Sequence, residues 1–225
     1  MFASILQLIF PRNCVACSNT LRKNENHLCT QCLIELPQTR FHETKDNVLA
    51  KTFWGRLTLE HALAFLFFKK GNIVQHILHE IKYKNNTDLA LFVGQYYGSI
   101  LAQANLKFDA VLPIPLHKSK LKKRGYNQSE EIVKGLCQSL HPENLSQYIV
   151  RKKATETQTR KTRYERWENV EQIFELKELS VFKNRHILLV DDVITTGATI
   201  EACAQALETT ENCKISLASI AVAYY

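Results

Sequence analysis

Residues 186–199, which read HILLVDDVITTGAT, contain the strongest fold signal in the sequence. The apolar run at residues 187–190 predicts a buried strand of a parallel sheet, and residues 199–209 have the apolar spacing of a helix. The adjacent carboxylates of Asp191 and Asp192 come where this strand is expected to end, at the sheet edge where α/β proteins bind ligands. Two neighbouring carboxylates repel each other, and they suit a ligand with two vicinal hydroxyl donors.

The residues after the Asp pair have the composition of an anion-binding turn: Thr195, Thr196, Gly197, Ala198 and Thr199. Free backbone N–H groups, hydroxyls and the dipole of the following helix favour a phosphate there, and Gly197 lets the backbone approach it closely. We therefore expect Gly197→Val to abolish anion binding while the fold survives. A diol site beside a monophosphate site describes a ribose 5-phosphate. The alternative is an ordinary strand–turn–helix whose threonines cap the helix.

Apolar strands alternate with amphipathic helices on both sides of this stretch. The pattern indicates an α/β domain with a mainly parallel sheet over residues 41–225. Residues 38–50 are polar, so we expect them to be irregular and place a domain boundary near residue 40. The predicted strands are 61–68, 108–112, 147–150, 186–190 and 214–224, and the predicted helices are 72–83, 87–104, 127–140 and 199–209.

Four of the seven cysteines form two pairs with the spacing of metal ligands: Cys14-x-x-Cys17 and Cys29-x-x-Cys32. Two such turns complete a tetrahedral Cys₄ shell, which is the closed form of a structural zinc site. Two disulfides, or unrelated buried thiols, are the alternatives. We expect residues 1–40 to form a small zinc module, in which the metal replaces a missing core, with a short amphipathic helix over residues 2–9.

The composition is that of a globular protein: 225 residues, 45% hydrophobic and 23% charged, with a net charge of +7. No apolar run approaches the roughly 18 residues of a membrane-spanning helix, and the N-terminus lacks the features of a signal peptide, so we expect a cytoplasmic protein. The positive charge is concentrated in residues 107–166, where 14 Lys and Arg face six Asp and Glu. Such a segment is either a solvated face or a site for phosphate-rich ligands. His76, His79 and Glu80 share a predicted helix face, but we interpret them as ordinary surface residues.

The segment VDDVITTGAT resembles the phosphoribosyl-pyrophosphate motif of type I phosphoribosyltransferases. The resemblance extends to the ComF-type (GntX-like) proteins over nearly the whole chain. It includes the Cys₄ module, residues 109–129 (DAVLPIPLHKSKLKKRGYNQS), and a block at residues 155–174 with Gln158, Arg163, Arg166 and Asn169. This family implies a zinc module on a type I phosphoribosyltransferase-like domain, with a link to DNA uptake and natural competence.

The resemblance also implies roles for particular residues. Asp191 and Asp192 would bind the ribose hydroxyls of phosphoribosyl pyrophosphate and act in catalysis, and residues 195–199 would bind its 5-phosphate. Residues 122–128 would belong to a mobile hood, and Mg²⁺ would hold the pyrophosphate. The pyrophosphate loop would comprise Pro115, Leu116, His117 and Lys118.

Two functions follow from these observations. One is a phosphoribosyltransferase, in which the bond from C1 to the pyrophosphate oxygen loosens through an oxocarbenium-like state and a nitrogen nucleophile attacks C1. The other is a non-catalytic DNA-uptake factor, in which the basic segment and the zinc module bind single-stranded DNA or a helicase partner. The sequence identifies neither the acceptor substrate nor its general base.

Overall fold

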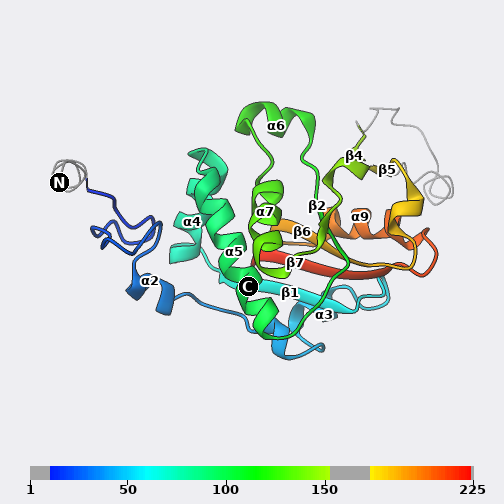
Figure 1. The fold of residues 1–225 in the computed structure, drawn as a ribbon, viewed down its shortest axis with the longest axis horizontal. Helices are drawn as coiled ribbons and strands as arrows, with labels where there is room; N and C mark the ends of the chain where they lie inside the picture. The colour runs from blue at the N-terminus through cyan, green and yellow to red at the C-terminus, as the bar shows by residue number, and fades with distance from the viewer. Residues whose placement is uncertain (1–10, 153–172, 224–225) are drawn as a thin grey trace.

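The computed structural model describes residues 11–152 and 173–223. Its centre is a five-stranded sheet in the order β1-β7-β6-β2-β3, in which every neighbouring pair is parallel (Figure 1). The strands of this sheet are β1 (His61–Phe68), β2 (Ala110–Pro113), β3 (Glu143–Asn144), β6 (His186–Ile194) and β7 (Lys214–Ala223). The parallel α/β architecture predicted from the sequence is therefore confirmed.

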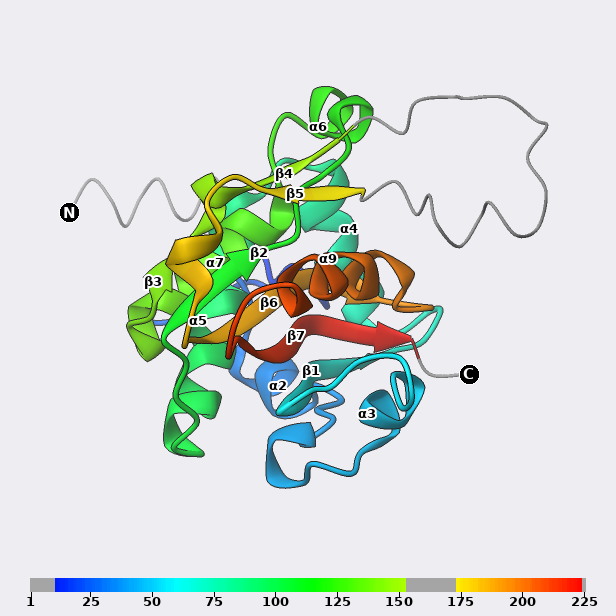
Figure 2. The ribbon, with the colours of Figure 1, turned by 90° about the vertical axis from the view of Figure 1, so that its right-hand side faces the viewer.

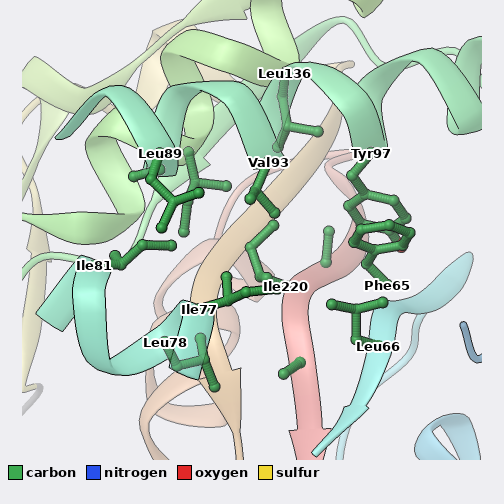
Figure 3. Packing of buried hydrophobic residues seen from close by; sticks show 14 of the residues in the cluster. Phe65, Leu66, Ile77, Leu78, Ile81, Leu89, Val93, Tyr97, Leu136 and Ile220 are labelled. Carbon is green, nitrogen blue, oxygen red and sulfur yellow. The ribbon is translucent and has the colours of Figure 1, made fainter. Parts of the chain in front are cut away.

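Helices cover both faces of the sheet, because its central strands are apolar on both sides (Figure 2). On one face α4 (Ile73–Tyr83), α5 (Thr87–Gln103) and α7 (Gln128–Leu140) bury a continuous apolar cluster (Figure 3). On the other face α9 (Ala198–Glu208) and α3 (Val48–Thr52) contribute to a second apolar cluster. A separate antiparallel pair, β4 (Ile149–Arg151) and β5 (Phe174–Leu176), adds Ile149 and Phe174 to this second cluster.

Two of the helices approach unusually closely because glycines lie at their interface. A Cβ added to Gly135 of α7 would lie 2.1 Å from the carbonyl oxygen of Leu91 in α5, and a Cβ on Gly94 would lie 2.2 Å from that of Ile132. Backbone atoms therefore occupy the space that a side chain would need. This contact fixes α7, and with it the residues at its start, against the sheet.

Most of the predicted elements are present within a residue or two of their expected ends, but some segments differ, and α2 (Thr30–Ile34), β3 and β5 were not predicted. Strand β6 continues through the Asp pair to Ile194, because the longer β7 provides backbone partners as far as Val222. Residues 38–50, predicted to be irregular, include α3 and the 3-10 turn η1 (Phe41–Glu43). Residues 118–124, for which no helix was predicted, form α6 (Lys118–Arg124).

The cysteine-rich segment packs on the α4 and α5 side of the sheet. Its buried Leu21, Leu28 and Leu36 belong to the same apolar cluster as Phe65 of β1. The following residues run along the outer edge of β1, where the N–H of Thr39 donates to the carbonyl oxygen of Phe65 at 2.9 Å. This contact covers the edge of a strand that would otherwise be open to pairing. A domain boundary near residue 40 remains a prediction.

Two predictions fall outside the described residues: the helix over residues 2–9, and most of the block at residues 155–174 with Gln158, Arg163, Arg166 and Asn169. Within the described part of the chain, no helix is both long enough and apolar enough to cross a membrane.

Candidate functional site: a ligand site at the sheet edge and a cysteine cluster

The two segments that were predicted to bind phosphate groups lie at the same edge of the sheet. Strands β2 and β6 are parallel neighbours, with Pro113 paired to Val190. The residues that follow them, 115–118 and 195–199, therefore both leave the carboxyl edge, where ligands of α/β proteins bind. The structure thus brings together residues separated by about 80 positions in the chain.

The N-cap residue of α9 has no side chain to cap the helix, and the hydroxyl oxygen of Thr196 accepts a long hydrogen bond, of 3.4 Å, from the N–H of Ala198. Gly197 is the N-cap residue, with a φ of 79° in the left-handed region. Thr195, Thr196, Ala198 and Thr199 are exposed. The first-turn N–H groups of a helix, together with its dipole, form a site for an anion.

Gly197 has a different packing role from the one predicted. A Cβ at this position would lie 2.6 Å from the ring of Phe53, which is buried next to α3. The absent side chain therefore faces an aromatic ring of the protein. The expectation that Gly197→Val removes only the anion site is corrected: the positive φ and the contact with Phe53 both predict a loss of stability.

Asp191 lies near the end of β6 and is held by short contacts. Its Oδ1 atom accepts a hydrogen bond from the hydroxyl of Ser129 at 3.2 Å and from the N–H of Asp192 at 2.8 Å. Burial and the neighbouring charge of Asp192 raise the pKa of Asp191 to about 7, although the N–H of Asp192, the charge of Lys82 and the Ser129 hydroxyl oppose the rise. This carboxyl group therefore titrates near neutral pH.

Asp192 is paired with two cations. Its Oδ1 atom is 3.0 Å from Nζ of Lys82, and its Oδ2 atom is 3.7 Å from Nη1 of Arg124. The side chains of Lys82, Arg124 and Asp192 are only 19%, 15% and 11% exposed, respectively. Lys82 was missed in the sequence, because a single lysine at the end of an amphipathic helix carries no signal of its own.

The residues after α6 hold the two cations in place. The hydroxyl of Tyr126 donates to the carbonyl oxygen of Ile81, next to Lys82, and Nδ2 of Asn127 donates to the carbonyl oxygen of Ile114 at 3.1 Å. Arg124 donates to Oε1 of Gln128 at 2.7 Å. The predicted hood at residues 122–128 therefore has two parts: a last turn of α6, and a buried anchor that joins α4, β2 and α7.

The predicted pyrophosphate loop leads directly into α6. Pro115, Leu116 and His117 are partly buried and Lys118 is exposed. The ring of His117 caps α6, with Nδ1 accepting from the N–H of Ser119 at 3.3 Å. The position of this loop beside the end of β6 is compatible with the predicted role, which remains a prediction.

The four clustered cysteines form a second candidate site. The Sγ atoms of Cys14, Cys17, Cys29 and Cys32 all lie within 4.8 Å of one another. The Sγ atoms of Cys17 and Cys29 are 3.7 Å apart, close to the spacing of about 3.8 Å that tetrahedral geometry gives for Zn–S bonds of about 2.3 Å. Burial raises the pKa of Cys14, but backbone N–H groups outweigh it and lower this pKa to about 7. The arrangement fits a closed thiolate site for one metal ion.

Glu25 supports this cluster, and sequence reasoning missed it. Its carboxylate accepts hydrogen bonds of 2.7 Å from the N–H of Arg22 and from both the N–H and the hydroxyl of Thr30. These bonds lower the pKa of Glu25 to about 2. Glu25 thereby ties the loop between the two cysteine pairs to α2 (Thr30–Ile34), which carries Cys32.

Comparison with known proteins agrees with this geometry. The family model "Phosphoribosyl transferase domain" matches residues 83–223. The chain is 30% identical over 200 residues to the DNA utilization protein YhgH of *Escherichia coli* K12, covering 86% of this chain and 83% of the relative. It is 26% identical to the competence protein ComFC of *Bacillus subtilis*, covering 86% and 77%. The chain belongs to the phosphoribosyl transferase domain family, as a member of the ComF type.

A shorter match and a more distant one complete the comparison. Competence protein F of *Haemophilus influenzae* is 35% identical over 100 residues, which are 44% of each chain. The glutamine phosphoribosylpyrophosphate amidotransferase of *Bacillus subtilis* superposes with a TM-score of 0.45 at 15% identity. That match covers 63% of this chain and 30% of the amidotransferase.

Proposed function

We propose that this protein binds phosphoribosyl pyrophosphate, or a related ribose 5-phosphate, at the carboxyl edge of its sheet. The observation that carries the proposal is the start of α9 at Gly197, an N-cap residue without a side chain, just after β6, the strand that carries Asp191 and Asp192. The 5-phosphate binds to the N–H groups of residues 195–199, and the ribose hydroxyls donate to the two carboxylates. Membership of the phosphoribosyl transferase domain family supports this ligand.

The same arrangement suits phosphoribosyl transfer. Loss of pyrophosphate leaves positive charge on C1 of the ribose, and the carboxylates of Asp191 and Asp192 stabilise that charge. Within the described residues, the four cysteines are the only group of three or more potential metal ligands that lie together. Mg²⁺ is therefore proposed to bind mainly through the phosphate oxygens of the ligand, as is common for this ion.

The relatives indicate a biological setting and a resident metal. Because they are named for DNA utilization and competence, we propose that this protein acts in the uptake or use of DNA. We assign zinc to Cys14, Cys17, Cys29 and Cys32, since four thiolates in a closed shell are typical of a structural zinc site. Free thiolates persist in a reducing compartment, so the proposed location is the cytoplasm.

The raised pKa of Asp191 predicts that ligand affinity depends on pH. The ionised carboxylate accepts the ribose hydroxyls, and with a pKa of about 7 it is mostly protonated at pH 6. We expect ribose 5-phosphate to bind about tenfold more tightly at pH 8 than at pH 6, and Asp191→Asn to weaken binding at pH 8 by about tenfold to a hundredfold. Calorimetry at the two pH values measures both effects.

The control for this experiment is the Asp191→Asn variant itself. It retains only the pH dependence that arises from the phosphate of the ligand. A wild-type protein with the same ratio of affinities between pH 8 and pH 6 as this variant would show that Asp191 does not contact the ligand. The stability of the ligand-free protein depends on pH in the opposite direction from the ligand affinity. The free energy of unfolding falls as the pH rises through about 7, because ionisation of the buried Asp191 carboxyl group is unfavourable.

A second candidate function, binding of single-stranded DNA, is favoured by the surface of α6. Four lysines of this helix are exposed, and the described part of the chain records no ion pair for any of them: Lys118, Lys120, Lys122 and Lys123. Helix α6 stands at the top of the molecule in Figure 1, away from the zinc module. Unpaired lysines on a projecting helix suit contacts with a phosphate backbone.

If α6 binds single-stranded DNA, affinity should fall steeply as salt is raised, because bound counterions are released. The double substitution of Lys122 and Lys123 by Glu should weaken binding and flatten the slope of log K against log salt by about one to two units. Fluorescence anisotropy with a labelled oligonucleotide measures both quantities. Lys69→Glu with Lys70→Glu is the matched control, since those lysines are also adjacent and exposed. Equal effects of the two pairs would argue against a site on α6.

A further inference from the structure

The segment that follows α3 lies along helix α9, whose start belongs to the proposed 5-phosphate site. At that start, a Cβ added to Gly197 would lie 2.6 Å from the ring of Phe53. Toward the other end of the helix, the N–H of Thr58 donates to Oε1 of Glu208 at 3.4 Å. The segment precedes residue 83, where the match to the phosphoribosyl transferase domain begins. Residues outside the matched domain therefore contact α9 near both of its ends.

Between these two contacts, Arg56 forms an ion pair with Glu201 in the first turn of α9. Nη1 of Arg56 donates to Oε2 of Glu201, and Nη2 donates to the carbonyl oxygen of Thr52. The guanidinium group also lies 5.6 Å from the centre of the Phe53 ring. The side chain of Glu201 is only 14% exposed, and Arg56 is the one cation paired with it in the part of the chain that the structure describes. Neutralisation of this carboxylate therefore depends on Arg56.

The position of Glu201 makes this neutralisation relevant to an anion site. Glu201 follows Gly197 by four residues, so the two lie on the same side of α9, about 6 Å apart along its axis. A carboxylate in the first turn interacts with the same positive end of the helix dipole that a phosphate would use. It also repels a phosphate directly, and water screens a largely buried charge only weakly. Without its partner, Glu201 would oppose phosphate binding at residues 195–199.

We propose that Arg56 is a positioning residue of the ligand site, which cancels the charge of Glu201 so that the positive end of α9 is available to a phosphate. This inference rests on the proposed function and deepens it, because it assigns to that site a residue from the segment before β1. Arg56 acts through Glu201 and does not itself need to contact the ligand. Its stacking on Phe53 is a second, packing effect, since that ring lies next to Gly197.

Removing the two charges singly and together separates the charge effect from the packing effect. Arg56→Met keeps an unbranched side chain and leaves Glu201 unpaired. In calorimetry at pH 8 we expect it to weaken ribose 5-phosphate binding by about tenfold, and the loss to shrink as salt is raised, because salt screens the repulsion. Glu201→Gln should bind at least as tightly as the wild-type protein. The double variant should bind within about threefold of wild type, because the repelling charge is gone although the packing of Arg56 is still absent.

Arg185→Met is the matched control for the loss of an arginine. Arg185 also donates to the carbonyl oxygen four positions earlier, that of Val181, and pairs with a glutamate, Glu143. It directly precedes β6, at the opposite end of that strand from the ligand site. Its substitution should leave the affinity for ribose 5-phosphate unchanged at every salt concentration.

The outcomes distinguish the inference from the proposed function. If the wild-type protein does not bind ribose 5-phosphate, both are wrong. If it binds, and Arg56→Met changes the affinity by less than about threefold, the role of Arg56 is wrong while the ligand site stands. A double variant as weak as Arg56→Met, with a loss that does not depend on salt, would also overturn the inference, because Arg56 would then act through packing alone.

Discussion

Replacing Cys29 by Ser should reduce the zinc content of the purified protein from one ion per chain to none and unfold the cysteine-rich module. The hydroxyl of serine is a poor zinc ligand, and three thiolates leave the shell open. Structural zinc contributes about 10–16 kcal/mol to the folding of small zinc modules. Without the metal, the buried Leu21, Leu28 and Leu36 lose the scaffold that packs them against β1 and α5.

Elemental analysis gives the zinc content, and limited proteolysis reports the unfolding of the module. Cys137→Ser is the matched control, because Cys137 lies on α7, outside the cluster. It should retain the full zinc content and the protease resistance of the wild-type protein. A freshly purified wild-type protein without zinc would contradict the assignment.

Replacing Gly197 by Val should lower both the stability and the ligand affinity of the protein. A β-branched residue at a φ of 79° is strained, and its Cβ would lie 2.6 Å from the ring of Phe53. Strain and overpacking together cost about 2–5 kcal/mol. For a chain of this size the midpoint of thermal unfolding should then fall by on the order of 10 °C. The stabilisation that ribose 5-phosphate gives should disappear, because the start of α9 can no longer keep its geometry.

Gly55→Val separates the two causes of the expected loss of stability, which are backbone strain and the contact with Phe53. Gly55 also has a positive φ, of 71°, but a Cβ there would meet no atom within 4 Å. Its substitution should therefore cost only the backbone strain, and it should leave the response to ribose 5-phosphate intact. Equal melting temperatures for the two variants would show that Phe53 does not support the turn.

The sequence predicts those parts of the fold that depend on local patterns. The apolar run before Asp191 identifies a central strand, and two Cys-x-x-Cys pairs identify the cluster of four cysteines, because in both cases the evidence lies within a few neighbouring residues. The end of β6 was placed too early, since its length depends on β7, a partner more than 20 residues away. The polar Asp pair suggested that β6 ends before residue 191, but pairing with β7 continues the strand to Ile194.

The parts of the site that could not be predicted arise from long-range contacts. Lys82 and Asp192 are 110 positions apart, and Phe53 and Gly197 are 144 apart, so no local pattern links either pair. The cysteine-rich module contains a comparable case in Glu25, whose carboxylate accepts from backbone N–H groups at both ends of a loop. An isolated charged or aromatic residue in the sequence does not indicate which contact it makes after folding.

Calorimetric titration with phosphoribosyl pyrophosphate, with and without Mg²⁺, tests the central claim most directly. We predict saturable binding to one site per chain, with competition by ribose 5-phosphate and a loss of affinity of about tenfold or more in Asp191→Asn. A protein that is folded and zinc-loaded but gives no binding heat with either compound, and no thermal stabilisation by them, would contradict the account.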